Sequence, residues 1–278
     1  MAIHIGERRA TRAYTPRAGE RAPAGPGQPT RRKSVRTPAV GASLLIGLLV
    51  WEILALLAPD PPTILPAPDV VAHRLWDLAA NGVLWHHIGV TLLEAGLGFG
   101  LAAVVGLLLG YLVAHAPLLD TMLAPYIAGT QAVPVVAVAP LMVLWFGFDL
   151  LPKVLTCAVV CFFPVLINTV VGIRSVDRAL IEAAQTFGAG RLRMLRYVEA
   201  PLAARSILGG LRLAITLSMT GAVVGEFVAS NAGLGYMLTY GRSYDTPLVF
   251  AALVSLAALA IAGYTAIGLI ERRLINWE

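Results

Sequence analysis

Charged residues and cysteines are both scarce in this sequence, and each shortage limits what the chain can be. Asp, Glu, Lys and Arg make up 13% of the 278 residues, whereas hydrophobic residues make up 58%. Soluble domains carry roughly 25% charged residues, so the composition excludes an ordinary water-soluble protein. It indicates instead a chain whose main solvent is lipid.

Only two cysteines are present, Cys157 and Cys161, and they stand four residues apart in an apolar run. That spacing places them on one face of a helix, where reduced cysteines pack as small hydrophobic residues. The five histidines are scattered, and the adjacent His86 and His87 point apart on a helix. The sequence therefore favours neither a metal site nor an enzyme embedded in the membrane. We expect no catalytic residue and no cofactor on this chain.

The apolar residues are gathered in six runs, each near the length that a helix needs to cross a bilayer. About 20 residues span the ~30 Å hydrocarbon core. Helices are favoured over a β-barrel because short segments of alternating hydrophobicity are missing. The predicted spans are residues 41–58, 88–114, 122–145, 154–172, 207–228 and 248–270. The sequence thus predicts an all-α polytopic membrane protein.

Basic residues concentrate before the first span, between the fourth and fifth spans, and after the last one. The alternate loops hold only Arg74, Lys153 and Arg242. The positive-inside rule then places both termini and residues 173–206 in the cytoplasm. Because topology explains these charges, we expect no nucleic-acid partner. Residues 1–40 contain almost no large apolar side chains and are predicted to be a disordered basic tail, followed by a transmembrane domain over residues 41–278.

Small residues and prolines inside the spans predict how the helices pack. Pairs of glycines four residues apart let helix backbones approach closely and predict a compact bundle with a subunit interface. These pairs are Gly96/Gly100, Gly106/Gly110 and Gly221/Gly225. Prolines in spans three and four, at 125, 134, 140 and 164, predict kinked helices beside a protein-covered or water-filled passage. Spans three to five are therefore the predicted pathway lining.

Few polar residues are available to line that passage. The candidates for the pathway or gate are Gln131, Pro134, Asn168, Ser218 and Glu226. Intrahelical hydrogen bonding is an equally good interpretation of each polar one. Glu226 suits either an outer gate or a charge that reaches water at a helix end.

Ionisable residues within the spans are costly in lipid and usually face the bundle interior. Arg212 is expected to extend toward the inner surface. For Glu52 and Glu94 two interpretations stay open, a contact with each other or a contact with a neighbouring helix.

The cytoplasmic segment between spans four and five carries its own helix signals. Ser175 or Asp177 can cap a helix over residues 178–187, and Gly188 and Gly190 can end it in left-handed conformations. A second, basic helix is predicted from Arg191 onward, with Pro201 at the entry to span five. A connection of about 30 residues with ordered helices is usually functional, although a plain surface hairpin is the alternative.

The segment also carries a recognisable pattern of residues. Glu182, Ala183 and Ala184 precede Gly188 by three intervening residues, and nine more separate Gly188 from Val198. With Pro201, this pattern resembles the EAA signature of ABC importer permeases, although Ala200 replaces the usual leucine. Five other segments are similar to permeases for nitrate, taurine and alkanesulfonates, so that the resemblance covers about residues 60–275. They are residues 65–68, 139–147, 168–177, 221–227 and 233–236.

This resemblance implies the membrane-spanning permease subunit of a type I ABC importer, with six transmembrane helices, a cytoplasmic coupling helix and no catalytic residues. It implies as partners two ATP-binding cassette ATPase subunits that hold the ATP and Mg²⁺, a second permease copy in a homodimer, and an extracytoplasmic solute-binding protein. The location would be the inner or plasma membrane. The coupling residues implied are Glu182, Ala183, Ala184, Gly188, Arg191 and Pro201.

The cargo implied is a small solute, either a sulfonate-, taurine- or nitrate-like anion or a small organic nutrient. The alternative function is a secondary transporter driven by an ion gradient. That class requires paired acids at mid-membrane, and the sequence offers only Glu94 as a candidate.

Overall fold

The computed structural model describes residues 36–58 and 64–274, and all its regular elements are helices. The predicted tail of residues 1–40 therefore lies almost wholly outside the described residues. The chain divides into two units, residues 1–47 and 48–278. The described part of the first unit is the start of α1, and the packing given below is that of the second unit.

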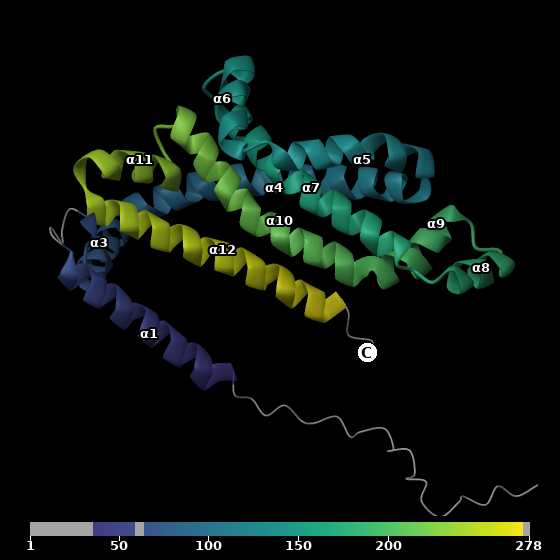
Figure 1. Cartoon of the computed structure of the whole chain (residues 1–278), viewed down its shortest axis with the longest axis horizontal. Helices are drawn as coiled ribbons and strands as arrows, with labels where there is room; N and C mark the ends of the chain where they lie inside the picture. The colour runs from purple at the N-terminus through teal and green to yellow at the C-terminus, as the bar shows by residue number, and fades with distance from the viewer. Residues whose placement is uncertain (1–35, 59–63, 275–278) are drawn as a thin grey trace, which may run out of the picture. The chain divides into compact units, whose positions relative to one another are not determined.

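The helices follow one another through short connections (Figure 1). In chain order they are α1 (Arg36–Leu57), α3 (Pro68–Ala80), α4 (Val83–His115), α5 (Pro117–Ala132), α6 (Val135–Phe146), α7 (Leu150–Arg174), α8 (Arg178–Thr186), α9 (Arg191–Met194), the π-helical turn η1 (Leu195–Glu199), α10 (Ala200–Ala229), α11 (Leu234–Tyr244) and α12 (Thr246–Leu274).

Four stretches of the described residues are long and apolar enough to cross a bilayer. They are Val83–His115, Leu150–Arg174, Arg191–Ala229 and Thr246–Arg273. These stretches contain four of the six predicted spans. The other two predicted spans fall on shorter apolar helices, Gly41–Leu57 and Val135–Phe146. The all-helical membrane fold is confirmed, and the count of six spans stays a prediction.

The predicted third span consists of two helices instead of one. α5 ends at Ala132, and α6 begins after Pro134, which has extended backbone at φ −68 and ψ 128. Proline has no N–H to continue a helix and disfavours helical backbone in the residue before it. Pro125 and Pro140 stay inside their helices, so Pro134 is the proline that divides this segment.

Helices α4, α7 and α10 pack against each other along their lengths and form the centre of the second unit (Figure 1). Glycines allow this close approach. A Cβ at Gly221 of α10 would lie 2.7 Å from Cα of Cys157, and one at Gly110 of α4 would lie 2.7 Å from Cβ of Thr169. Both cysteines are free and buried there, as predicted.

The glycine prediction is correct for only part of α4. Gly106 and Gly110 lie against α7, but Gly96 and Gly100 have nothing within 4 Å of an added Cβ. Gly98, which has no glycine partner at spacing four, instead contacts Cys157. Helix α4 faces α7 with residues 98, 102, 106 and 110, so Gly96 and Gly100 take no part in this packing, and the predicted subunit interface stays a prediction.

A second cluster of buried side chains joins α3, α11 and α12 to the start of α4. Val71, Leu84, Leu234 and Leu248 are among its members. Helix α3 begins without a side-chain cap. The N-cap is Ala67 without a side-chain hydrogen bond, and Asp69 lies in the first turn, where a carboxylate still favours the positive helix end.

Candidate functional sites

The connection between α7 and α10 begins with α8, whose ends are both fixed by local chemistry. The Asp177 carboxylate accepts a hydrogen bond from the Ala179 N–H at 2.9 Å, which satisfies one of the free donors at the helix start. The helix stops at Thr186, and Gly188 adopts a left-handed backbone at φ +77. Gly190 has φ −74, so Gly188 alone supplies the predicted left-handed turn.

The surface of α8 and of the turn that follows it is largely exposed. α8 buries none of its side chains, and Phe187 is 91% exposed. Glu182, Ala183, Gly188 and Arg191 are also exposed, whereas Ala184 is half-buried. Exposed apolar side chains beside small ones commonly mark a surface that another protein covers.

The chain beyond Gly190 does not form the separate second helix that the sequence predicted. α9, η1 and α10 join into one continuous helix from Arg191 to Ala229. Pro201 lies in the first turn of α10, directly after the π-helical turn. The wider hydrogen-bonded ring of a π-turn lets the helix pass a residue that lacks an N–H.

Two polar contacts fasten both flanks of this connection to the end of α4. Before it, the Arg174 guanidinium donates to the Val113 carbonyl at 3.0 Å. After it, Nε2 of His115 lies 2.8 Å from Oε1 of Glu199. Glu199 is 3% exposed, and a buried carboxylate is costly unless it is paired. The last turn of α4 therefore contacts both the end of α7, which leads into the exposed segment, and η1, which leads out of it.

A cavity of about 560 Å³ is lined by α8, α9 and η1 on one side and by the C-terminal end of α4 and the start of α5 on the other. Its lining residues are Tyr111, Leu112, His115, Ala116, Leu119, Ile181, Gln185, Ala189, Arg191, Met194 and Glu199. α8 faces this cavity with Ile181 and Gln185 and has no side chain that is fully buried in a packed core.

A second cavity of about 490 Å³ lies among α6, α7 and α10. Its lining residues are Val133, Val135, Val138, Thr156, Val159, Val160, Phe163, Pro164, Ile167, Asn168 and Leu213. The two polar members bond to their own helix: Thr156 donates to the Pro152 carbonyl, and the Asn168 amide donates to the Pro164 carbonyl. None of these lining residues is charged.

Of the five pathway candidates, the structure places Asn168 in this cavity wall. Pro134 lies between two lining valines, and Ser218 is fully buried and donates to the Ile215 carbonyl. The side chain of Gln131 lies outside those that the structure describes. Glu226 is 1% exposed, so the interpretation that it reaches water at the helix end is wrong. Their role in the pathway stays a prediction.

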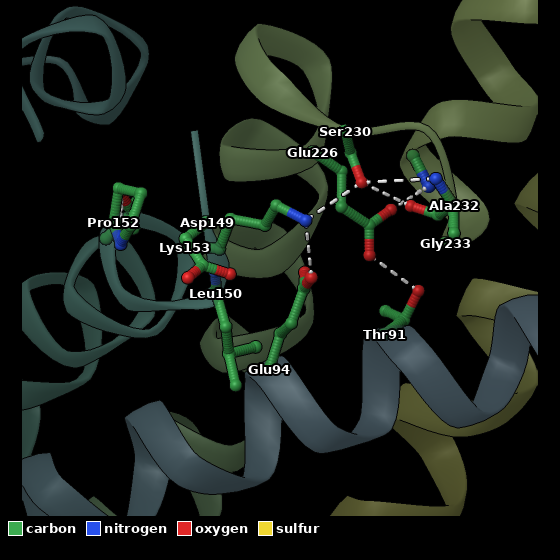
Figure 2. A network of polar contacts seen from close by, with 12 residues as sticks. Thr91, Glu94, Asp149, Leu150, Pro152, Lys153, Glu226, Ser230, Ala232 and Gly233 are labelled. Atoms are coloured by element: carbon green, nitrogen blue, oxygen red, sulfur yellow. Dashed lines mark hydrogen bonds and ion pairs between the residues drawn. The ribbon is translucent and has the colours of Figure 1, made fainter. Parts of the chain in front are cut away.

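Glu226 belongs to a buried polar network at the other end of α7 and α10 (Figure 2). Nζ of Lys153 donates to Oε1 of Glu94 at 2.9 Å and to Oγ of Ser230 at 2.9 Å. Lys153 is 8% and Glu94 is 1% exposed. Of the two interpretations of Glu94, the contact with a neighbouring helix is therefore correct, and Lys153 belongs to α7 instead of a loop.

The Glu226 part of the network holds the N-terminus of α11. Its carboxylate accepts from the Thr91 hydroxyl at 2.7 Å and from the Gly235 N–H. Thr91 in turn accepts from the Leu234 N–H at 2.8 Å. These bonds satisfy donors that a helix start leaves free, and the carboxylate is favoured by the positive end of the helix.

Gly233, with φ +107, completes this arrangement. A Cβ at this position would collide with the Glu226 carboxylate. The Gly233 N–H donates to Nδ1 of His87 at 2.9 Å.

Sequence reasoning missed Lys153, Thr91 and Ser230. A lysine in the first turn of an apolar run was the available signal. Among the described residues, no three His, Cys, Asp or Glu side chains lie close enough to hold a metal ion.

Comparisons with known proteins agree with these features. Residues 103–276 match the family described as binding-protein-dependent transport system inner membrane component. The chain is 49% identical over 244 residues to the riboflavin transport system permease protein RibX of Chloroflexus aurantiacus, a match that covers 87% of this chain and 91% of that protein. It is 32% identical to the taurine transport system permease protein TauC of Escherichia coli, over 85% of this chain and 88% of that one.

Solved structures show the same fold. A chain of the inward-facing MetNI methionine ABC transporter matches with a TM-score of 0.58 at 19% identity, over 72% of this chain and 98% of that one. A chain of an amino acid ABC transporter matches with a TM-score of 0.56 at 21% identity, over 72% and 97%.

Proposed function

The chain belongs to the family of binding-protein-dependent transport system inner membrane components, the non-catalytic permease subunits of ATP-driven ABC importers, and we propose that it couples to its ATPase partners through α8 and the Gly188 turn. Hydrolysis of ATP takes place on those partners, which bind ATP and Mg²⁺. The present chain supplies the membrane passage and the surface on which the ATPases act.

One observation carries the coupling proposal: a short helix with no buried side chain presents Phe187, 91% exposed, beside Ala183 and Gly188. Small residues leave room for a partner to approach, and an exposed aromatic ring supplies the contact area that typically dominates binding. The cavity behind α8 allows the helix to move when the partner moves.

Basic residues on both flanks of α8 support a cytoplasmic position for this segment and for both termini. ABC permeases act with ATPase subunits and a solute-binding protein. We infer for this chain a homodimer of permease copies with one ATPase beneath each α8, and a solute-binding protein at the opposite end, where α3 and α11 lie.

The coupling surface is tested by Phe187→Ser in the permease. We expect ATPase binding to weaken by about 2 kcal/mol, roughly thirtyfold, because the change removes an exposed aromatic anchor. Binding of purified ATPase to the permease in nanodiscs is the measurement. The control is Phe148→Ser, which removes a phenylalanine that is 81% exposed at the opposite end of α7. Equal affinity of both variants for the ATPase would refute the assignment.

The cavity among α6, α7 and α10 is our candidate for the translocation passage, and its lining favours an uncharged cargo. A sulfonate needs positive charge or several donors. Thr156 and Asn168, the two polar residues in the wall, already donate to helix carbonyls. Of the two cargo classes that the sequence implied, an uncharged organic nutrient fits better than an anion, and the relative at 49% identity is named for riboflavin.

Uptake into proteoliposomes that contain the whole importer and its binding protein distinguishes the two classes. We expect ATP-dependent accumulation of riboflavin that excess taurine leaves unchanged. Accumulation of taurine without riboflavin would overturn the cargo assignment and leave the coupling assignment standing.

A further inference from the structure

A small charged cavity opens between α10 and α12, and it shares no lining residue with the cavity among α6, α7 and α10 or with the cavity at α8. Its volume is about 290 Å³, and its lining residues are Arg205, Arg212, Glu271 and Arg272. Three arginines and one glutamate give it a formal charge of +2. Each arginine carries several donors, so a recess lined by three of them suits an anionic group.

Arg212 is held firmly at the base of this cavity. Its guanidinium pairs with the Glu271 carboxylate and lies over the Tyr264 ring, 4.8 Å from the centroid. A Cβ at Gly268 would lie 2.8 Å from Nη2 of Arg212, so this glycine leaves space for the side chain. Nε of Arg212 is buried with no hydrogen-bond partner among the described residues.

The face of α12 that continues from the cavity is apolar and exposed. Ile261, Tyr264, Gly268 and Glu271 follow one another at spacings of three and four residues, which place them on one side of the helix. Ile261 is 64% and Tyr264 is 47% exposed. A positive recess therefore lies at the end of an apolar strip. This arrangement matches an anionic phospholipid, whose charged head group is joined to apolar acyl chains.

We propose that this recess binds the phosphate head group of an anionic phospholipid, with an acyl chain along the Ile261–Tyr264 side of α12. Arg205 and Arg272 supply charge-assisted donors to the phosphate oxygens, and basic recesses between membrane helices suit anionic head groups. A free phosphate would use the arginines but not the apolar strip. Lipid binding here would brace the two helices that carry these residues, α10 and α12.

The test uses the importer purified with its ATPase subunits from bilayers that contain phosphatidylglycerol and phosphatidylcholine. Native mass spectrometry measures the phosphatidylglycerol retained per permease chain. With each surface arginine contributing about 1 kcal/mol, we expect retention to be about fivefold weaker in Arg272→Gln and about thirtyfold weaker in Arg205→Gln/Arg272→Gln.

The matched control is Arg273→Gln, which removes the same charge from the adjacent residue of the same helix and does not line the cavity. We expect its retention to match that of the parent importer. Equal losses in Arg272→Gln and Arg273→Gln would overturn the proposal, because attraction would then come from surface charge in general. Displacement of the lipid by millimolar inorganic phosphate would also overturn it in favour of a free-anion site.

Discussion

At the scale of single residues, Lys153 supplies the positive charge that pairs with the buried Glu94 carboxylate in the network at the start of α7. The variant Lys153→Met keeps the length of the side chain and removes its charge, which leaves the Glu94 carboxylate 1% exposed and unpaired. Removing one partner of a buried ion pair costs about 3–5 kcal/mol. We expect a clear fall in the thermal unfolding midpoint of the purified importer.

The companion variant changes both partners, Lys153→Met with Glu94→Leu. Because an apolar pair of similar volume is often as stable as a buried ion pair, this double variant should recover most of the lost stability. An unchanged midpoint in the single variant would mean that Glu94 is not charged in the folded protein. A double variant less stable than the single one would mean that the network acts through packing.

Local signals at the residue scale could be predicted from the sequence, and long-range partners could not. Asp177 and Gly188 act within three residues of their own positions, so helix-cap and turn chemistry placed each among two candidates, with Ser175 and Gly190 as the others. Lys153 pairs with Glu94 across 59 positions, and its place near the end of an apolar run made it look like a loop residue. Only the packing of α4 against α7 brings the two together.

At the scale of helices, the joint between α4 and η1 is expected to carry motion from the coupling segment into the bundle. His115→Ala breaks the contact with Glu199 while leaving α8 and its exposed surface intact. We expect fewer solutes moved per ATP hydrolysed, by about two- to thirtyfold, since residues along a coupling network change it by about 0.5–2 kcal/mol. ATPase binding should be unchanged.

Transport and hydrolysis measured together in proteoliposomes provide this ratio. The control variant is Arg74→Gln with Asp245→Asn, which removes an ion pair of 2.5 Å between α3 and the start of α12. If the control lowers the ratio as much as His115→Ala does, the effect reflects general loosening of the bundle. If neither variant lowers it, motion does not pass through this joint.

Helix boundaries were predictable where periodicity was strong and less so where prolines occur. α7 and α12 contain their predicted spans with a few residues added at each end. Two prolines, however, act in opposite ways. Pro134 separates α5 from α6, whereas Pro201 sits inside a continuous helix because a π-helical turn precedes it. Proline identity alone does not distinguish a break from an accommodated kink, because the neighbouring backbone decides the outcome.

At the scale of the whole molecule, α4 is the element that connects the two ends. His115 near its C-terminus holds Glu199, and Thr91 near its N-terminus binds the loop that starts α11. These two residues lie about 36 Å apart along the helix axis. We therefore expect a motion of α8 to reach the opposite end through this one helix. The EAA pattern predicts where this path begins, and that stays a prediction, whereas its far end depends on contacts among α4, α10 and α11 that no local pattern contains.

Orientation in the membrane is the last expectation, and two exposed phenylalanines, one before α7 and one after α8, test it. The variant Phe187→Cys places a thiol after α8, and the variant Phe148→Cys places one before α7. The native Cys157 and Cys161 are buried and should not react. With the basic segments in the cytoplasm, a membrane-impermeant maleimide should label Phe148→Cys in intact cells or spheroplasts and Phe187→Cys only in inverted vesicles. The reverse pattern would place α8 outside, where no ATPase could reach it, and would exclude coupling through this helix.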